Sequence, residues 1–206
     1  MKYLLVTLTL LINSCDNENN ALIRDKTASE GSITDGIYSS KQFGWSIKVP
    51  RSWEVVTSSS EVDEIRQEGR KMINDVNPNV PQGNKPVQLL FAKKNMSSFV
   101  AIAEKLEDSE TLDLNHQVHA QKKLLTDVYE SQGIPVVESK VEEGLLDGVE
   151  CEILTLAMGD RENLLGQLYY LVKRRGYLLI FCITFDNKAD RDEIYESLND
   201  CKFESD

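Results

Sequence analysis

The chain contains two histidines, His116 and His119, and their spacing would place both imidazoles on one face of a helix. Such a pair can hold a metal ion, but a metal site needs a third and a fourth ligand, and Asp113 is the one candidate nearby. A solvated helix face is the commoner use of this spacing. We therefore expect no metal and no other cofactor, and keep His116 and His119 as the candidate ligands if a metal does bind.

Two pairs of acidic residues could take part in acid and base catalysis, Glu142 with Glu143 and Glu150 with Glu152. Such catalysis requires an environment that moves the two pKa values of a pair apart. Glu150 and Glu152 alternate with apolar residues, so they share one face of a strand, and we place them at its exposed end. We expect these carboxylates to be solvated. The sequence also lacks a G-x-S-x-G motif, and we predict no catalytic residue.

Lys173, Arg174 and Arg175 form the one basic cluster of an acidic chain, at the tip of a predicted hairpin. These side chains could bind a carboxylate or a phosphate of a partner. A solvated turn is the alternative, because exposed charges contribute little to stability and occur at many hairpin tips. We take the three residues as candidate partner-binding residues.

A second candidate contact is the segment of residues 77–87, whose three prolines and one glycine interrupt both helical and strand periodicity. A connection of this length exceeds the usual ~4–6 residues, and such loops are often functional or disordered. Its prolines would reduce the entropy lost on docking. We expect a partner to contact Asn77, Pro78, Asn79 and Pro81, with an ordinary surface loop as the open alternative.

The N-terminal residues indicate where the protein is sent. Lys2 precedes an apolar run, residues 3–12, which is too short to span ~30 Å of hydrocarbon but is typical of a secretory signal peptide. The run ends in Ile12-Asn13-Ser14-Cys15, which resembles the lipobox of bacterial lipoproteins. We predict that residues 1–14 are a lipoprotein signal peptide and that Cys15 carries the lipid, palmitate included. Ordinary secretion is the alternative.

Charge limits the partners of the mature chain. Without residues 1–14, which contain one lysine, 22 basic and 34 acidic side chains remain, a formal charge of −12. This charge argues against nucleic acid and against docking on anionic lipid, so the membrane contact would depend on the acyl chains of Cys15. The acidic residues after Cys15 resemble a surface-export tag of Bacteroidetes lipoproteins, whereas Asp16 favours inner-membrane retention under the enterobacterial rule. We expect the outer membrane or cell surface and leave the leaflet open.

The pattern of apolar residues predicts the fold. Residues 15–35 are polar and indicate a lipidated flexible tether, so the folded domain is predicted over residues 36–206. The strand at 177–185 is apolar on both faces, which requires helices on both sides of the sheet. We predict an α/β (α+β) fold, a three-layer α/β/α sandwich with a mostly antiparallel central sheet. Strands are expected at 43–49, 53–56, 88–93, 99–106, 136–142, 149–157, 165–173 and 177–185, and helices at about 60–76, 114–131 and 187–198.

Three cysteines remain in the predicted domain, Cys151, Cys182 and Cys201. The first two lie inside apolar strand patterns, where cysteine behaves as a small buried hydrophobic residue. No C-x-x-C pair is present, so neither a redox dithiol nor a structural zinc site is indicated. We expect buried thiols, and one disulfide with one free thiol is left open.

The order of these elements resembles the PsbP-like fold. This group includes photosystem II extrinsic subunits, Ran-binding proteins of yeast and many bacterial lipoproteins. Its characterised members bind other proteins and are not catalysts, so the resemblance implies a noncatalytic role. The residues that carry the resemblance are Phe43-Gly44-Trp45-Ser46-Ile47, Val49-Pro50, Trp53-Glu54-Val55, Gly176-Tyr177 and Lys202-Phe203.

Together these observations predict a lipid-anchored bacterial envelope protein that acts as a noncatalytic protein-binding or assembly module. Its expected partners are a membrane, through the lipid on Cys15, and a protein, with no role for nucleic acid. An envelope hydrolase with scattered catalytic residues is one alternative, and it would require a cleft with convergent ionisable groups. A carrier of a small hydrophobic ligand is another, and it would require an apolar cavity between helix and sheet.

Overall fold

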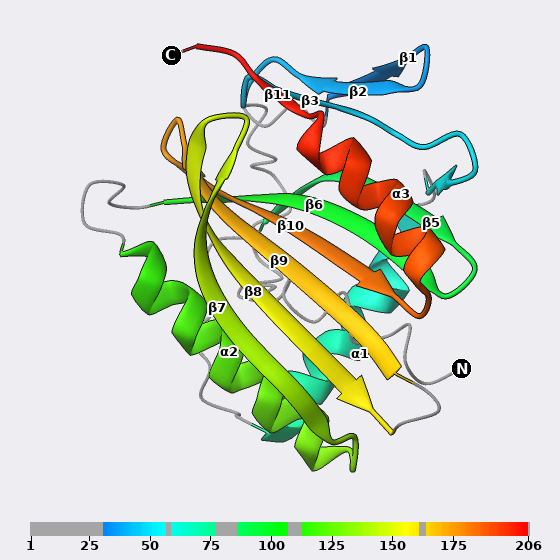
Figure 1. Cartoon of the computed structure of the whole chain (residues 1–206), viewed down its shortest axis with the longest axis vertical. Helices are drawn as coiled ribbons and strands as arrows, with labels where there is room; N and C mark the ends of the chain where they lie inside the picture. Colours follow the sequence, from blue (N-terminus) through cyan, green and yellow to red (C-terminus); the bar gives the residue numbers. More distant parts are fainter. Residues whose placement is uncertain (1–30, 57–58, 77–85, 107–112, 161–163, 206) are drawn as a thin grey trace, which may run out of the picture.

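The computed structural model describes residues 31–56, 59–76, 86–106, 113–160 and 164–205. Within this part of the chain the main sheet has seven strands, and every neighbouring pair is antiparallel (Figure 1). Their order across the sheet is β4 (Glu54–Val55), β5 (Val87–Lys94), β6 (Ser97–Lys105), β10 (Tyr177–Phe185), β9 (Leu164–Arg174), β8 (Val149–Gly159) and β7 (Val136–Leu146).

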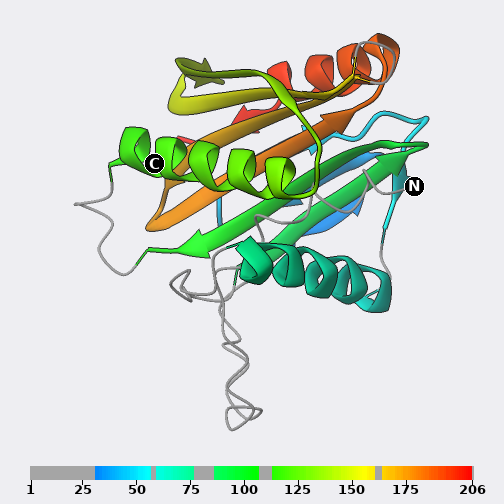
Figure 2. The same ribbon diagram turned by 90° about the horizontal axis from the view of Figure 1, so that it is seen from below.

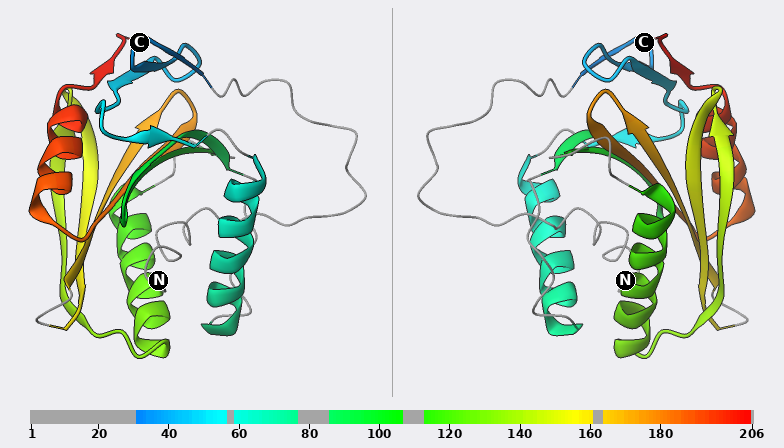
Figure 3. Two further views of the ribbon diagram at one scale, coloured as in Figure 1. Left: turned by 90° about the vertical axis from the view of Figure 1, so that its right-hand side faces the viewer. Right: turned by 90° about the vertical axis from the view of Figure 1, so that its left-hand side faces the viewer.

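Two outer layers cover this sheet. Helices α1 (Ser59–Val76) and α2 (Leu114–Ser131) lie on one face, and α3 (Lys188–Asn199) lies on the other with a small second sheet (Figures 2 and 3). Each face of the main sheet has its own apolar core. The predicted three-layer α+β fold is therefore confirmed. The small sheet consists of β1 (Ser32–Thr34), β2 (Ile37–Ser40), β3 (Trp45–Lys48) and β11 (Lys202–Phe203). Only β3 was predicted, within the strand expected at 43–49.

Strand β10 lies at the centre of the main sheet, between β6 and β9. Leu178, Ile180 and Cys182 belong to the core under α1 and α2, whereas the alternate residues Leu179 and Phe181 belong to the opposite core. Because a strand buried on both faces needs apolar residues at every position, its continuous apolar sequence is explained. The prediction that residues 177–185 form the central strand is confirmed.

Tight turns with two left-handed residues join three of the hairpins. Asp147 and Gly148 have φ of 48° and 79°, and Arg175 and Gly176 have 48° and 78°. Asp35-Gly36, with φ of 52° and 77°, makes the same turn between β1 and β2, and we did not predict it. The predicted tether boundary at residue 35 is corrected by this hairpin, because the folded part already includes β1.

A buried polar network fixes the C-terminal end of α2 on the sheet. The hydroxyls of Tyr129, on α2, and Tyr169, on β9, both donate to Oε1 of Gln167 at 2.7 Å. Nε2 of Gln167 donates to Oγ1 of Thr184 at 3.2 Å, and all four residues are fully buried. Burial raises the pKa of both tyrosines well above the usual value, so they stay protonated and act as donors.

A charged cluster fixes α3 on the opposite face. Nζ of Lys94 lies 2.8 Å from Oδ1 of Asp190 and 2.7 Å from Oε2 of Glu193. Burial alone would raise the pKa of Asp190, but hydrogen bonds from Lys94, Asn187 and Ser97 lower it below its usual value. Hydrogen bonds from Lys94 and Ser52 likewise lower the pKa of Glu193. The helix is therefore attached through carboxylates that are fully partnered.

The three cysteines of the domain are buried and unbridged in the structure. Cys151 and Cys201 belong to the core beneath α3 and the small sheet, and Cys182 to the core beneath α2. Their expected role as small buried side chains is confirmed.

Candidate functional site

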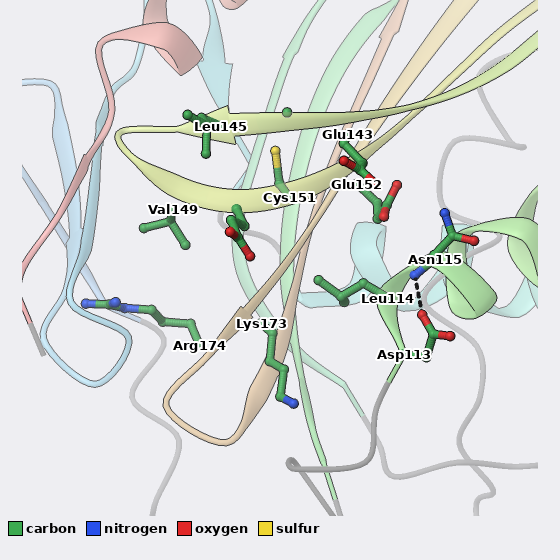
Figure 4. A pocket seen from close by; sticks show the side chains of 12 residues that line it. Asp113, Leu114, Asn115, Glu143, Leu145, Val149, Cys151, Glu152, Lys173 and Arg174 are labelled. Carbon is green, nitrogen blue, oxygen red and sulfur yellow. Dashed lines mark hydrogen bonds between the residues drawn. The ribbon is translucent and has the colours of Figure 1, made fainter.

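A hollow of about 970 Å³ lies where the ends of β7, β8 and β9 meet the start of α2 (Figure 4). We call it the acidic groove, because acidic side chains outnumber basic ones on its wall. It lies at the end of α2 opposite to the Tyr129 network. Its lining residues are Asp113, Leu114, Asn115, Glu143, Gly144, Leu145, Val149, Glu150, Cys151, Glu152, Lys173 and Arg174.

Strand register gathers three glutamates on one face of the β7–β8 hairpin. The tight turn at Asp147-Gly148 pairs Glu143 with Glu152 and Leu145 with Glu150. Cross-strand partners share a face and their Cβ atoms lie about 4.5–5.5 Å apart. Further along β8 the same face carries the leucines that pack under α2. The apolar pattern of this face therefore changes to carboxylates at the groove.

Glu152 is the most unusual of these residues. It is 7% exposed, and its Oε2 atom is buried without a hydrogen-bond partner. In Figure 4 its side chain lies beside that of Glu143, its cross-strand partner, on the side of the groove where α2 begins. Two like charges at opposed positions destabilise a sheet, and a buried unpaired carboxylate costs more.

The charge of Glu152 also affects its neighbour on the other face of β8. Burial raises the pKa of the Cys151 thiol to about 11, and the Glu152 carboxylate contributes a further rise. The thiol is therefore protonated at neutral pH and is a poor nucleophile.

The start of α2 does not supply the missing partner. Oδ1 of Asp113 accepts hydrogen bonds from the backbone N–H groups of Asn115 at 3.0 Å and His116 at 3.2 Å. These are the donors that a helix N-terminus would otherwise offer to an anion. Since Asp113 already occupies them, they are not available to Glu152.

The predicted basic cluster is divided by the alternation of β9. Lys173 is half-buried and lines the groove. Arg174 is 8% exposed, donates to the carbonyl oxygen of Glu204 and lies 5.8 Å from the ring centre of Phe203. Arg175 donates to the carbonyls of Lys41 and Gln42 at 3.1 and 3.3 Å. Both arginines thus hold the C-terminal segment and the turn before β3, and the role of the three residues in partner binding stays a prediction.

The structure places the remaining predicted residues as follows. His116 and His119 are exposed on α2, and within the described residues no group of three or more His, Cys, Asp or Glu could hold a metal ion. Glu142 is exposed and pairs with Lys140 at 2.5 Å. Five predicted residues lie outside the described part of the chain: Cys15, Asn77, Pro78, Asn79 and Pro81.

One expectation about the groove was wrong. We placed both Glu150 and Glu152 at the exposed end of a strand, but only Glu150 is exposed, whereas Glu152 is buried between β7 and β9 at the start of α2. Sequence reasoning also missed the opposition of Glu143 and Glu152. The signal was present, because a two-residue Asp-Gly turn fixes every pair of the hairpin.

No protein-family model and no curated protein sequence matches the chain. Among solved structures it is similar to the cyanobacterial PsbP (CyanoP) of Synechocystis, with 16% identity and a TM-score of 0.48, over 86% of this chain and 98% of that chain. It is also similar to LpqN of Mycobacterium tuberculosis, a protein involved in cell envelope biogenesis, with 13% identity and a TM-score of 0.40, over 77% of this chain and 82% of that chain. Identities this low concern the fold alone, so the argument about function rests on the residues of this chain.

Proposed function

We propose that this chain is a lipid-anchored bacterial envelope protein that acts as a noncatalytic protein-binding or assembly module, and that the acidic groove is the surface that contacts its partner. The observation that carries the proposal is the Oε2 atom of Glu152, which is buried without a hydrogen-bond partner, with Glu143 as the cross-strand neighbour. A folded chain gains nothing from such a group alone. A partner that supplies the missing donors would convert this cost into affinity and specificity.

The side chains of the groove support binding rather than catalysis. Its described lining contains no histidine and no hydroxyl group, so a Ser-His type of nucleophile and base is not assembled there. The one thiol is that of Cys151, whose pKa is raised to about 11 by burial and by the Glu152 charge. What remains is a set of charged side chains next to an exposed leucine, Leu145. Such a surface is suited to recognition.

Carriage of a small hydrophobic ligand has less support. That role needs an apolar cavity between helix and sheet, but among the described residues apolar side chains fill the space between α2 and β8. Val118, Leu125 and Val128 of α2 pack in one cluster with Leu154 and Leu156 of β8, and all five are at most 1% exposed. Interiors packed in this way have few voids larger than a water molecule.

The anchor is the part of the proposal that comes from the sequence alone. No helix within the described residues is long and apolar enough to cross a membrane. Each acyl CH₂ buried in the bilayer contributes ~0.8 kcal/mol, so the lipid chains of a modified Cys15 would hold the protein firmly. Cells grown with a fatty-acid analogue should label the wild type and not Cys15→Ala, and the variant should leave the membrane fraction. An unlabelled wild type would contradict the anchor.

The binding role can be tested by cross-linking in the native envelope. A photoreactive amino acid at Leu145, which is 68% exposed and lines the groove, should give a discrete adduct with an envelope protein. The matched control is Ile37, an exposed apolar residue on β2. The same adducts from both positions, or no adduct from Leu145, would contradict a binding role for the groove.

A further inference from the structure

We propose that Glu143 and Glu152 receive the guanidinium group of an arginine side chain that the protein partner contributes. The inference rests on the proposed function, because the arginine belongs to the partner. It adds the chemistry by which the partner is recognised. It also assigns a role to Glu143 and Glu152.

The excess of acidic side chains in the groove favours a cationic ligand. The lining contains four acidic and two basic side chains, but Asp113 is engaged in capping α2 and Arg174 in holding the C-terminal segment. Glu143, Glu150 and Glu152 then face a single cation, Lys173. Within the described part of the chain none of these four forms an ion pair, and Oε2 of Glu152 has no hydrogen-bond partner. An incoming positive charge would be attracted by this excess.

The geometry favours a guanidinium over an ammonium group. Glu143 and Glu152 are direct cross-strand partners, so a planar group between them meets a carboxylate on each side. A guanidinium has five donors in a rigid fork and can bond both carboxylates, whereas an ammonium is a strongly hydrated point charge. Arginine also loses less hydration energy on entering a buried position such as that of Glu152.

The walls of the groove suit the rest of an arginine-containing segment. Leu145 is 68% exposed and Leu114 is half-buried, and both line the groove, so they offer apolar surface to the aliphatic part of the side chain. Figure 4 shows these two leucines on different elements, β7 and α2, with the glutamates on the strands. A hollow of about 970 Å³ is larger than one side chain, so it also has room for partner backbone.

If Glu152 had a purely structural role, its replacement would destabilise the fold. A carboxylate that stabilises the fold has donors, as Asp190 has in Lys94, Ser97 and Asn187. Glu152 faces a like charge instead. Replacing it by the neutral isostere glutamine should therefore leave the fold intact or more stable while it removes recognition.

The test uses three blocked tripeptides, glycine-arginine-glycine and its analogues with citrulline or lysine in the middle. Citrulline has nearly the shape of arginine without its charge. Backbone amide shifts of the folded protein are followed during titration. The matched control variant for Glu152→Gln is Glu142→Gln, because Glu142 pairs with Ile153 on the other face of the same hairpin.

The expected result is that the arginine peptide binds the wild type and Glu142→Gln equally, and shifts the amides of Glu143, Leu145 and Glu152. Citrulline and lysine peptides should bind at least about tenfold more weakly, and Glu152→Gln should weaken the arginine peptide by about tenfold or more. Equal affinity for citrulline or lysine would overturn the inference. Unchanged affinity of Glu152→Gln for the arginine peptide would also overturn the inference. So would the absence of binding at a peptide concentration ten times the ~1 mM dissociation constant expected of one charged contact.

Failure of this inference and failure of the proposed function give different results. If Leu145 cross-links a partner in cells while the arginine peptide does not bind, the module function stands and the arginine assignment is wrong. If the peptide binds as expected while Leu145 yields no adduct, the cation site stands and the partner is not a protein at this groove.

Discussion

The two ends of helix α2 bury polar side chains against the same sheet in opposite ways. At the C-terminal end, Tyr129, Tyr169 and Thr184 converge on Gln167, and this amide has a partner on both its oxygen and its nitrogen. At the N-terminal end, Glu152 is almost as deeply buried, but one of its oxygens has no partner and its cross-strand neighbour is another glutamate. The first end is closed, and the second opens into the acidic groove.

This difference distinguishes a buried polar group that stabilises the fold from one that is left without a partner in the fold and can bind a ligand. Buried networks stabilise only when every member is satisfied, because a single unpaired polar group costs about as much as a hydrogen bond contributes. The network around Gln167 meets this condition, and Glu152, whose Oε2 atom is buried without a partner, does not. The following predictions test whether the two ends differ in this sense.

The largest effect is expected from Gln167→Leu. The substitution removes the acceptor of two tyrosine hydroxyls and the donor to Thr184, so these buried groups lose hydrogen bonds. Because each such group costs ~1–3 kcal/mol, the free energy of unfolding should fall by about 3–5 kcal/mol. Urea denaturation followed by circular dichroism measures this. A loss below about 1 kcal/mol would mean that the network is not what holds this end of α2.

The charged cluster under α3 offers a second fully partnered comparison. Asp190→Asn removes the charge that pairs with Lys94, and should cost about 2 kcal/mol at neutral pH, as expected for hydrogen bonds to charged groups. Since the folded-state pKa values of Asp190 and Glu193 are lowered, their stabilisation is present above the unfolded-state pKa and is lost as the pH falls through the folded values.

The wild type should therefore lose stability on acidification more steeply than Asp190→Asn. The pKa of Lys94 is raised by hydrogen bonds with Asp190 and Glu193, so its own contribution is present at neutral pH and is lost when the pH rises through that value. Unfolding curves measured from neutral to acidic pH compare the two proteins. Parallel pH profiles would show that Asp190 is not the partnered carboxylate described above.

A smaller change of opposite sign is expected from Glu152→Gln. The glutamine has nearly the shape of the glutamate and removes the repulsion from Glu143, so the free energy of unfolding should rise by about 0.5–1 kcal/mol. Glu142→Gln, on the exposed face, should change it by less than about 0.5 kcal/mol. Destabilisation by Glu152→Gln would assign Glu152 a structural role and remove the contrast between the ends of α2.

The smallest effect is expected on the pKa of Cys151, the residue that precedes Glu152 on β8. The pKa of Cys151 is raised to about 11, mainly by burial and to a lesser extent by the Glu152 charge. Glu152→Gln should therefore lower the pKa of Cys151 slightly and leave it well above that of a free thiol. Alkylation rates of Cys151 across alkaline pH, read by peptide mass spectrometry, give this pKa. A rise in the variant would be the wrong sign.

Most secondary structure could be predicted from the sequence, because it depends on local periodicity. The helix at 114–131 was predicted with the bounds of α2, and residues 177–185 were predicted as the central strand β10. Only β3 of the small sheet was predicted, within 43–49, whereas β1, β2 and β11 were missed because they are two to four residues long, too short for a periodic signal. Asp35-Gly36 was the available indication of the β1–β2 hairpin.

The acidic groove could be predicted only in part. The turn at Asp147-Gly148 implies that Glu143 faces Glu152, since register follows from turn length. The burial of Glu152 does not follow from the hairpin, because it depends on β9 on one side and on where α2 begins over the face. These are contacts between segments distant in sequence. The hydrogen bonds of Arg174 and Arg175 within the domain could not be predicted for the same reason, because their partners lie near the two ends of the domain.

The most direct test of the account is the unfolding free energy of wild type and Glu152→Gln, each measured with and without the arginine tripeptide. A ligand that binds only the folded state stabilises it by RT ln(1 + [L]/Kd), about 1.4 kcal/mol at ten times Kd. The account predicts that the variant is the more stable protein without peptide, and that the peptide stabilises the wild type and not the variant. A variant that is less stable than the wild type, and that gains as much from the peptide, would contradict the claim that Glu152 is held for a partner.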